Sequence, residues 1–202
     1  MIERIKNTMR NLEKNGFEVR YFENEFSAVD SLLKDISADE SVGFGGSMTV
    51  SELGIYDKLV KQGSAVYWHQ KKPDDRAAEL GRAATATVYL TGTNAITEDG
   101  RLVNIDGTGN RTSSMLFGHD RAYIIAGVNK IARNLDEAMI RIKNVACPKN
   151  AERLKLDTPC RHLGKCMNCD SPQRMCNATL ILERQPKGVK VILYLINENL
   201  GY

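Results

Sequence analysis

The sequence predicts an α/β fold, an open and mostly parallel sheet with helices on both faces. Short β-branched and aromatic segments alternate with amphipathic helical segments along the 202 residues, and this alternation is typical of parallel sheets covered on both sides. An apolar content of 42% and a charged content of 26% are ordinary for a globular protein. The length suits one domain spanning residues 1–202.

The first half of the chain predicts helices and strands in alternation. Apolar residues recur at helical spacing from Ile2 to Leu12, and Asn15-Gly16 ends that helix as a C-cap would. Residues 17–21 alternate in polarity, which indicates a strand. In chain order we then expect a helix over 27–33 capped by Ser27, a strand over 41–44, a helix over 50–61 that Gly63 stops, a strand over 65–68 and a helix beginning at Pro73.

The second half continues this alternation. Residues 87–90 and 121–126 indicate strands, and residues 135–142 indicate a helix. Two strands, 179–182 and 189–195, flank a short Gln-Pro-Lys-Gly turn, so we expect an antiparallel pair at the C-terminal edge of the sheet. Residues 147–177 are rich in Cys, Pro and polar residues and show little periodicity. We expect an irregular segment there, held by something other than a hydrophobic core.

Charge and hydropathy exclude several classes of function. The net charge of +3 is too small to argue for nucleic-acid binding. No apolar run approaches the roughly 20 residues of a membrane-spanning helix. The N-terminal residues carry charges throughout and lack the apolar centre of a secretion signal. We therefore expect a cytoplasmic protein without a membrane span.

Glycine-rich loops after predicted strands are the candidate binding segments. Twelve of the sixteen glycines lie between Gly43 and Gly127, and ligands of open α/β sheets bind outside the carboxyl ends of strands. Glycine lets backbone N–H groups approach an anion; a tight strand-to-helix turn explains the first loop equally well. The candidate residues are Gly45, Gly46, Ser47, Thr49, Thr93, Asn94, Asp106, Gly107, Thr108, Gly109, Asn110, Arg111, Asn129 and Lys130.

Two of these loops have simpler interpretations as well. Asp106-Gly107 suits a turn that closes a hairpin beginning at Ala95, although such a turn explains the nearby Arg111 less well. Lys130 is favoured on sequence alone as a solvated surface group, because lysine is rarely buried. At Gly46 and Gly107 we expect backbone conformations that a Cβ atom would obstruct. A positive φ at either position would be one cause, because residues with a side chain rarely adopt it.

All five cysteines lie between Cys147 and Cys176. In a cytoplasmic chain this argues against a disulfide framework and toward a metal site or reactive thiols. Four thiolates from one irregular segment can surround a zinc ion or a [4Fe–4S] cluster, and prolines beside two of the cysteines slightly favour the cluster. Buried packing residues or a reversible dithiol are the alternatives. The expected ligands are Cys160, Cys166, Cys169 and Cys176.

Several stretches resemble the lactate-utilisation (LUD) domain family, and they span the whole chain. They are GFGGSMTVSELGI, GTNAITEDGRLVNIDGTGNR, GVNKI, TPC…GKCMNCDSPQRMC and the closing ENLGY. The chain is similar to a small stand-alone member with a cysteine-rich C-terminal segment. The resemblance implies a fold like that of CoA transferases and ribose-5-phosphate isomerase. It also implies a role in bacterial oxidation of L-lactate to pyruvate, as an accessory or redox subunit beside other lactate-oxidation proteins.

The same resemblance implies that the four glycine-rich loops converge on one pocket. Arg111 and Lys130 would hold the carboxylate or phosphate of a small ligand, and the amides of Gly45 and Gly46 would donate further hydrogen bonds. On this basis Arg111→Ala is expected to weaken binding and leave thermal stability nearly unchanged. A non-catalytic anion-sensing or partner-docking module, and a CoA- or sugar-phosphate-type enzyme, are the alternative functions. A homodimer is a further assembly that we consider.

Overall fold

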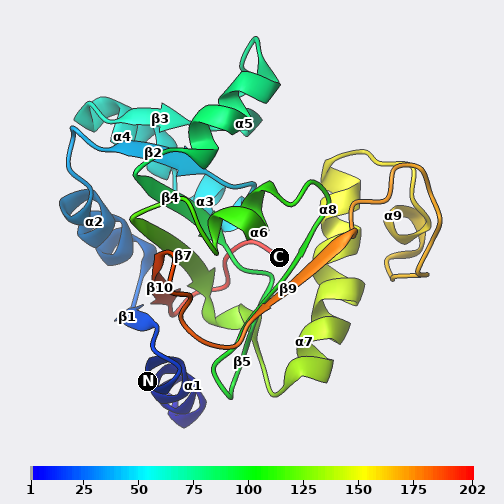
Figure 1. The fold of residues 1–202 in the computed structure, drawn as a ribbon. Coiled ribbons are helices and arrows are strands. Elements are labelled where there is room, and N and C mark those ends of the chain that lie inside the picture. Colours follow the sequence, from blue (N-terminus) through cyan, green and yellow to red (C-terminus); the bar gives the residue numbers. More distant parts are fainter. Residues whose placement is uncertain (1) are drawn as a thin grey trace.

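A computed structural model describes residues 2–202, so residue 1 of the predicted domain lies outside the described part (Figure 1). The main sheet has six strands, all parallel, in the spatial order β1-β10-β7-β4-β2-β3. This confirms the predicted α/β class and its mostly parallel sheet. The strands are β1 (Glu18–Phe22), β2 (Ser41–Phe44), β3 (Ala65–Tyr67), β4 (Val88–Gly92), β7 (Arg121–Gly127) and β10 (Lys190–Ile196).

Helices connect and cover these strands. Near the N-terminus of the sequence the amphipathic segments form helices close to the predicted positions, and Asn24 rather than Ser27 caps the second one, accepting from the Ser27 amide. The helices are α1 (Glu3–Lys14), α2 (Glu25–Asp35), α3 (Met48–Glu52), α4 (Ile55–Gln62), η1 (His69–Lys71), α5 (Arg76–Ala84), α6 (Asn110–Ser114), η2 (Val128–Lys130), α7 (Leu135–Arg141), η3 (Ile142–Ala146), α8 (Cys147–Arg153) and α9 (Pro159–Leu163).

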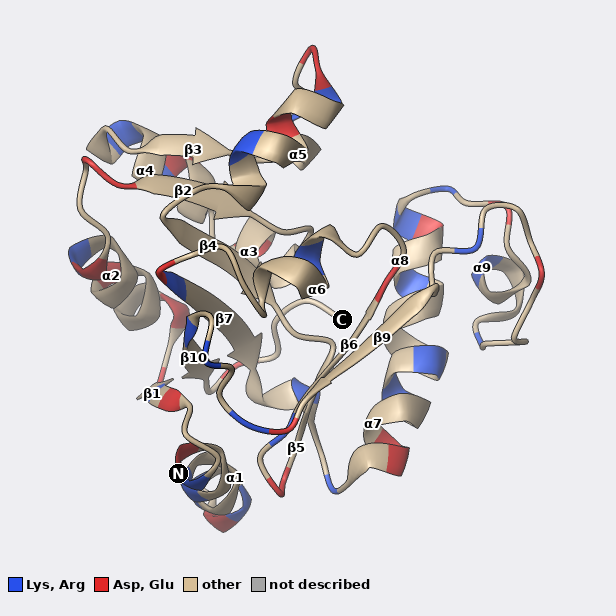
Figure 2. Ribbon diagram, in the orientation of Figure 1, with Lys and Arg blue, Asp and Glu red and all other residues tan. Residues whose placement is uncertain are grey.

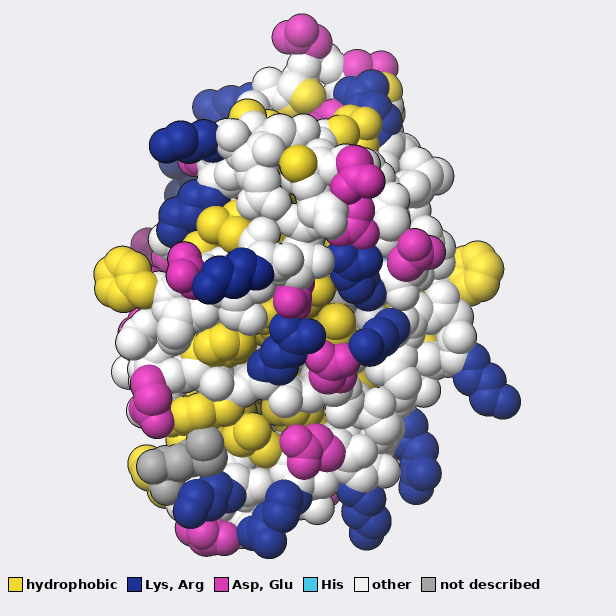
Figure 3. Space-filling model, turned by 90° about the vertical axis from the view of Figure 1, so that its left-hand side faces the viewer, with side chains coloured by type: hydrophobic (Ala, Val, Ile, Leu, Met, Phe, Trp, Pro, Cys, Tyr) yellow, Lys and Arg dark blue, Asp and Glu magenta, His cyan; other side chains and the backbone are white. Residues whose placement is uncertain are grey.

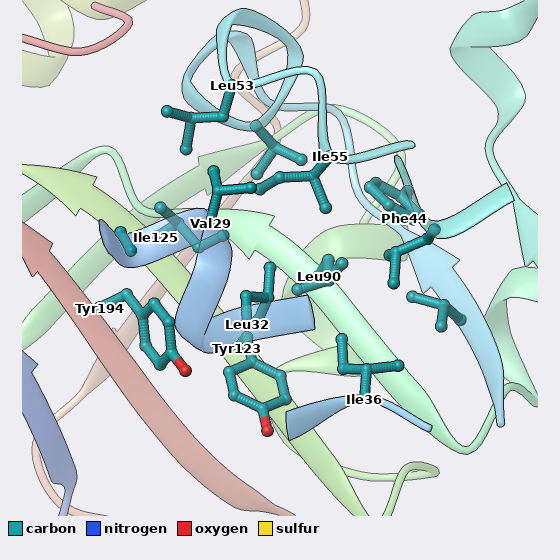
Figure 4. Packing of buried hydrophobic residues seen from close by; sticks show 14 of the residues in the cluster. Val29, Leu32, Ile36, Phe44, Leu53, Ile55, Leu90, Tyr123, Ile125 and Tyr194 are labelled. Atoms are coloured by element: carbon teal, nitrogen blue, oxygen red, sulfur yellow. The ribbon is translucent and has the colours of Figure 1, made fainter. Parts of the chain in front are cut away.

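The main sheet is apolar on both faces because successive side chains of its central strands point to opposite sides. On β7 and β10, Tyr123, Ile125 and Tyr194 face one core cluster with α2, α3 and α4. Figure 4 shows these side chains packed between α2 and the sheet. The intervening residues, Ile124 and Leu193 among them, face a second cluster with α1. Both faces are therefore covered.

The chain also forms a second, four-stranded sheet, which was not expected from the sequence. Its order is β8-β5-β6-β9, with β8 (Ile131–Ala132), β5 (Ala95–Thr97), β6 (Leu102–Asp106) and β9 (Ala178–Leu182). Leu102 and Ile96 pack against the cluster that includes α1, whereas Val103 faces Ala138 of α7. The hairpin between β5 and β6 exists, but its turn lies around Gly100 and not at Asp106-Gly107.

Three further details of the predicted secondary structure are wrong. The C-terminal strands do not pair with each other: β10 lies inside the main sheet, parallel to β1 and β7, and β9 is an antiparallel edge strand of the second sheet. The helix expected over 50–61 is two helices, because Gly54 adopts φ 62° between them. The helix expected to end at Ile142 continues through a π-helical turn into α8, so the irregular segment begins only after Arg153.

Among residues 2–202, no helix combines the length and the apolar character that crossing a membrane would require.

Candidate functional site

A cavity of about 460 Å³ opens where several strands end. Gly46 follows β2, Gly92 ends β4 and Lys130 follows β7, so the cavity lies at the carboxyl ends of parallel strands, as in other open α/β sheets. Its volume is typical of a small-molecule site. Ten of the fourteen predicted residues line it: Gly46, Ser47, Thr93, Asn94, Asp106, Gly107, Thr108, Asn110, Arg111 and Lys130.

The other four predicted residues, Gly45, Thr49, Gly109 and Asn129, do not line the cavity but hold neighbouring segments in place. The amide of Gly45 donates to the carbonyl of Leu90 at 2.9 Å, so it is not free to bind a ligand. Thr49 is fully buried beneath Lys130. Gly109 precedes α6 with φ 84°, a conformation that favours glycine. The side-chain amide of Asn129 pairs with both backbone groups of Leu200.

Basic side chains predominate around the cavity. Five lysines or arginines line it against a single acidic residue, Asp106. Figure 2 shows Lys and Arg positions on α5, α6 and α8, the three helices that contribute the arginines. An excess of positive charge in a partly enclosed cavity favours anionic ligands. The five basic residues are Lys72, Arg76, Arg111, Lys130 and Arg153.

Most of the hydrogen-bonding capacity of Arg111 is used by the protein itself. Its Nε donates to Oδ1 of Asp106 at 2.9 Å, and its Nη2 donates to Oδ1 of Asn94 at 2.8 Å and to the carbonyl of Ile105 at 3.1 Å. The other carboxylate oxygen of Asp106 accepts from the amide of Thr112. Arg111 and Asp106 are both only 8% exposed. This pair fixes the end of β6 and the start of α6, and it borders the cavity as a neutral unit.

Lys130 is buried, which overturns its interpretation as a surface lysine. Only 5% of the residue is exposed, and Nζ donates to Oγ1 of Thr49 at 2.8 Å. Among residues 2–202, no carboxylate forms an ion pair with it. Burial, together with the positive charges of Arg141 and Arg111, lowers the pKa of Lys130 to about 7. The lysine is therefore poised between its charged and neutral forms at physiological pH.

The last residues of the chain fold back over this lysine. Thr49 Oγ1, which accepts from Lys130, lies 3.3 Å from the carbonyl of Leu200 and donates to it. The amide of Gly201 donates to Oε2 of Glu52, and Tyr202 reaches the cavity wall. The closing Glu-Asn-Leu-Gly-Tyr motif thus covers the base of the site.

Several lining residues were missed by the sequence analysis. His69 was treated as an ordinary histidine, yet it borders the cavity, and its Nδ1 is buried without a hydrogen-bond partner in the described structure. Burial lowers the pKa of this imidazole. Gln70, Arg76 and Arg153 come from segments without glycine-rich loops, so loop composition held no signal for them. The sequence did hold a signal for Tyr202, because it belongs to the closing Glu-Asn-Leu-Gly-Tyr stretch that resembles the family.

The cysteine-rich segment forms one wall of the site. Cys147 and Met175 line the cavity, and the backbone of Met175 lies so close to Gly107 that a Cβ there would meet the Met175 carbonyl oxygen at 2.9 Å. Neither Gly46 nor Gly107 has a positive φ. The lack of space at Gly107 comes from this packing and not from backbone strain.

Polar contacts order the segment 154–177, which carries Cys160 in helix α9 and Cys166, Cys169 and Cys176 in the loop after it. Arg174 donates to the carbonyls of Cys169 and Cys176, at 2.7 and 3.1 Å. The Ser171 hydroxyl donates to the carbonyl of Asp157 at 2.7 Å. The segment has few apolar residues to pack, and these side chain-to-backbone hydrogen bonds stabilise its conformation instead.

The five cysteines are free thiols of intermediate burial. Burial, and to a smaller extent the neighbouring Cys176, Cys166 and Cys160, raises the pKa of Cys147 to about 12. These thiols therefore share one neighbourhood. Over residues 2–202, however, no three His, Cys, Asp or Glu side chains are positioned to hold a metal ion. The predicted metal site is thus not preformed in the described arrangement.

The fold and site define an α/β protein with a basic, partly enclosed cavity at the carboxyl end of its parallel sheet. The chain belongs to the LUD domain family, whose model matches residues 5–194. It is also similar to a solved structure, a DUF162 family protein from Deinococcus radiodurans, with a TM-score of 0.56, 12% identity and 97% of each chain covered. That likeness concerns the fold. No curated protein matches the sequence significantly.

Proposed function

We propose that the protein binds a small organic anion, a carboxylate or a phosphate ester, in the cavity at the strand ends. The observation that carries this proposal is the charge of the cavity wall. Asp106 neutralises Arg111, which leaves Lys72, Arg76 and Arg153 as lining cations without an ion-pair partner among residues 2–202, beside the titrating Lys130. A carboxylate or phosphate is the ligand that charge-assisted hydrogen bonds from such groups stabilise.

The family and the cavity together favour a role in organic-acid metabolism. We propose that the anion is a lactate-like hydroxy acid or its oxidised 2-oxo form, and that the chain acts as an accessory or redox subunit in oxidation of L-lactate to pyruvate. Membership of the LUD domain family supports this role, and it also supports other lactate-oxidation proteins as partners.

Calorimetric titration tests the anion proposal. The protein is titrated with L-lactate, pyruvate, inorganic phosphate and CoA, first as the wild type and then as Arg153→Gln. The matched control is Lys149→Gln, which removes one charge from the same helix but lies outside the cavity. We expect R153Q to weaken carboxylate binding about threefold or more, a modest factor because Arg153 is exposed to solvent, and K149Q to leave it unchanged.

The outcomes separate the alternative functions. Binding of CoA or phosphate in preference to both carboxylates would favour an enzyme of the CoA or sugar-phosphate type. Equal losses in R153Q and K149Q would indicate a general charge effect and contradict the cavity as the site.

We also propose that Cys160, Cys166, Cys169 and Cys176 ligate one metal centre. Their free state, their partial burial and the shared neighbourhood of three of them with Cys147 support this proposal. Thiolates are good ligands for zinc and for iron–sulfur clusters. A cluster would supply one-electron transfer, whereas zinc would only crosslink the loop. The loop would have to close around the ion.

Anaerobic purification with metal and sulfide analysis tests the metal proposal. About four irons with labile sulfide would support a cluster, and one zinc per chain would support a structural site. Protein without metal, together with an unchanged fold in the Cys166→Ser/Cys169→Ser double variant, would contradict both.

A further inference from the structure

Lys130 is placed differently from the other basic residues of the cavity. Its Nζ lies at the inner end, 3.6 Å from the position that a Cβ atom on Gly92 would occupy. Both residues line the cavity. A side chain on Gly92 would collide with Ser47 Oγ and narrow the approach to the amine. The absence of a side chain at position 92 therefore keeps the amine accessible to a molecule in the cavity.

The charges around Lys130 disfavour its ammonium form. Arg111 of α6 and Arg141 of α7 raise the local potential, and Glu52 of α3 opposes them only in part. Glu52 is itself engaged, since its Oε2 accepts from the amide of Gly201 at 2.8 Å. A desolvated lysine beside other cations carries a neutral amine at a pH where exposed lysines are charged, and such amines are nucleophiles.

The single hydrogen bond of Lys130 keeps this amine reactive. The Thr49 hydroxyl has one proton, which it donates to the carbonyl of Leu200, so it serves Lys130 as an acceptor. Nζ therefore donates one of its hydrogens, and its lone pair is not used by any hydrogen bond among residues 2–202. Thr49 positions the amine without blocking its attack.

We propose that Lys130 is a catalytic residue that forms a Schiff base with the carbonyl carbon of a small 2-oxo acid held in the cavity. This inference rests on the proposed function, since the cavity cations would hold the carboxylate while the keto group faces Nζ. The lone pair of Nζ attacks the carbonyl carbon, and the carbonyl oxygen accepts protons as the C–O bond breaks. Both amine hydrogens leave with that oxygen as one water molecule, so the step consumes no oxidant and no reductant.

Borohydride trapping tests the proposal. The protein is incubated with pyruvate near pH 7 and treated with sodium cyanoborohydride, which reduces an imine to a stable secondary amine. We expect a mass increase equal to pyruvic acid minus one oxygen atom, and peptide mapping should place it on Lys130. Labelling there should exceed labelling of each exposed lysine by about tenfold or more, because exposed amines are almost entirely protonated at this pH.

Four variants supply the controls. Lys130→Met should abolish the adduct, whereas Lys71→Arg should retain it, because Lys71 is paired with Asp57 outside the cavity. Thr49→Val should slow labelling without abolishing pyruvate binding, and Thr49→Ser, which keeps the hydroxyl, should restore the rate. This split between rate and binding separates a positioning role of Thr49 from a merely structural one.

Calorimetry on the same samples separates this inference from the proposed function. Pyruvate binding without an adduct would overturn the Schiff base and leave anion binding intact. Labelling that persists equally in K130M would overturn it as well. Failure of pyruvate, lactate and phosphate all to bind would overturn the proposed function itself.

Discussion

The Arg111–Asp106 pair shows how a residue with a ligand-binding chemistry can serve the fold instead. The Asn-Arg pair after two glycines suggested a carboxylate clamp, yet the structure fills that clamp with the protein's own Asp106, Asn94 and a backbone carbonyl. Removing one partner of a buried ion pair leaves the other charge without compensation. We therefore expect Arg111→Ala to destabilise the protein, whereas the sequence analysis expected thermal stability to stay nearly unchanged.

We predict that Arg111→Ala lowers the free energy of unfolding by about 3–5 kcal/mol, the usual cost of leaving one buried charge unpaired. Urea denaturation followed by circular dichroism measures this loss. The Arg111→Ala/Asp106→Asn double variant should recover part of it, because the orphaned charge is gone. A single variant as stable as the wild type would show that the pair is not structural.

A second prediction at the residue scale concerns Lys130 and the pH dependence of the free energy of unfolding. Its pKa is about 7 in the folded protein and about 10.4 in an unfolded chain. Between these values the unfolded chain binds more protons, so the free energy of unfolding rises with pH. We predict that wild-type stability increases relative to Lys130→Met from pH 7 toward pH 10. Parallel pH profiles of the two proteins in urea denaturation would contradict a lowered pKa.

The elements of the fold were predictable where their sequence pattern was long and local. Strand β2 and helix α2 have apolar periodicity and end signals within a few residues, and both were found. Strands β5 and β8, of three and two residues, are too short to show a period, so the second sheet was missed. Pro148 suggested a loop, because proline has no N–H to donate within a helix. The helix nevertheless continues, since the π-helical turn directly before Pro148 changes the hydrogen-bonding pattern at this point.

The candidate site was predicted in part for the same reason. Glycine-rich loops after strands are a local signal, and most of their residues do line the cavity. Burial of Lys130 and engagement of Arg111 depend on contacts with distant segments, such as Thr49 and Asn94, which no local pattern encodes. The basic residues from α5 and α8 join the wall only through the tertiary fold.

The contact between Gly107 and the Met175 backbone predicts a coupling between two elements. Gly107→Ala would place a Cβ 2.9 Å from the Met175 carbonyl oxygen, and backbone has little freedom to move away. We predict that this variant displaces the cysteine-rich loop, raises its amide hydrogen exchange and weakens anion binding. Gly81→Ala, with open space around the Cβ position in helix α5, is the matched control and should change neither.

At the scale of the whole molecule, positively and negatively charged residues are nearly balanced, and the excess of basic residues lies around the cavity. Figure 3 shows Lys and Arg interspersed with Asp and Glu on the face turned toward the viewer. A mixed surface of this kind creates no broad field of one sign there. The excess of basic over acidic residues around the cavity is therefore a local property, one that the net charge of +3 does not reveal.

The place of β10 predicts how the molecule responds to truncation. Strand β10 pairs with β1 on one side and β7 on the other, and it supplies residues to both core clusters. We predict that a chain ending at Val189 loses cooperative thermal unfolding in calorimetry and exposes hydrophobic surface to a dye. A cooperative transition in that shortened chain would show that β1 and β7 can join without the intervening strand.

During synthesis on the ribosome, the same arrangement delays completion of the main sheet until residues 190–196 have left the exit tunnel. The nascent chain can already assemble β7, β4, β2 and β3, but β7 then presents an open backbone edge, and α1 with β1 has no strand to dock on. An unpaired edge of that kind invites association with other chains. The protein therefore depends on its final strand to close this edge, so the interval between translating β7 and releasing β10 is when a chaperone would matter most.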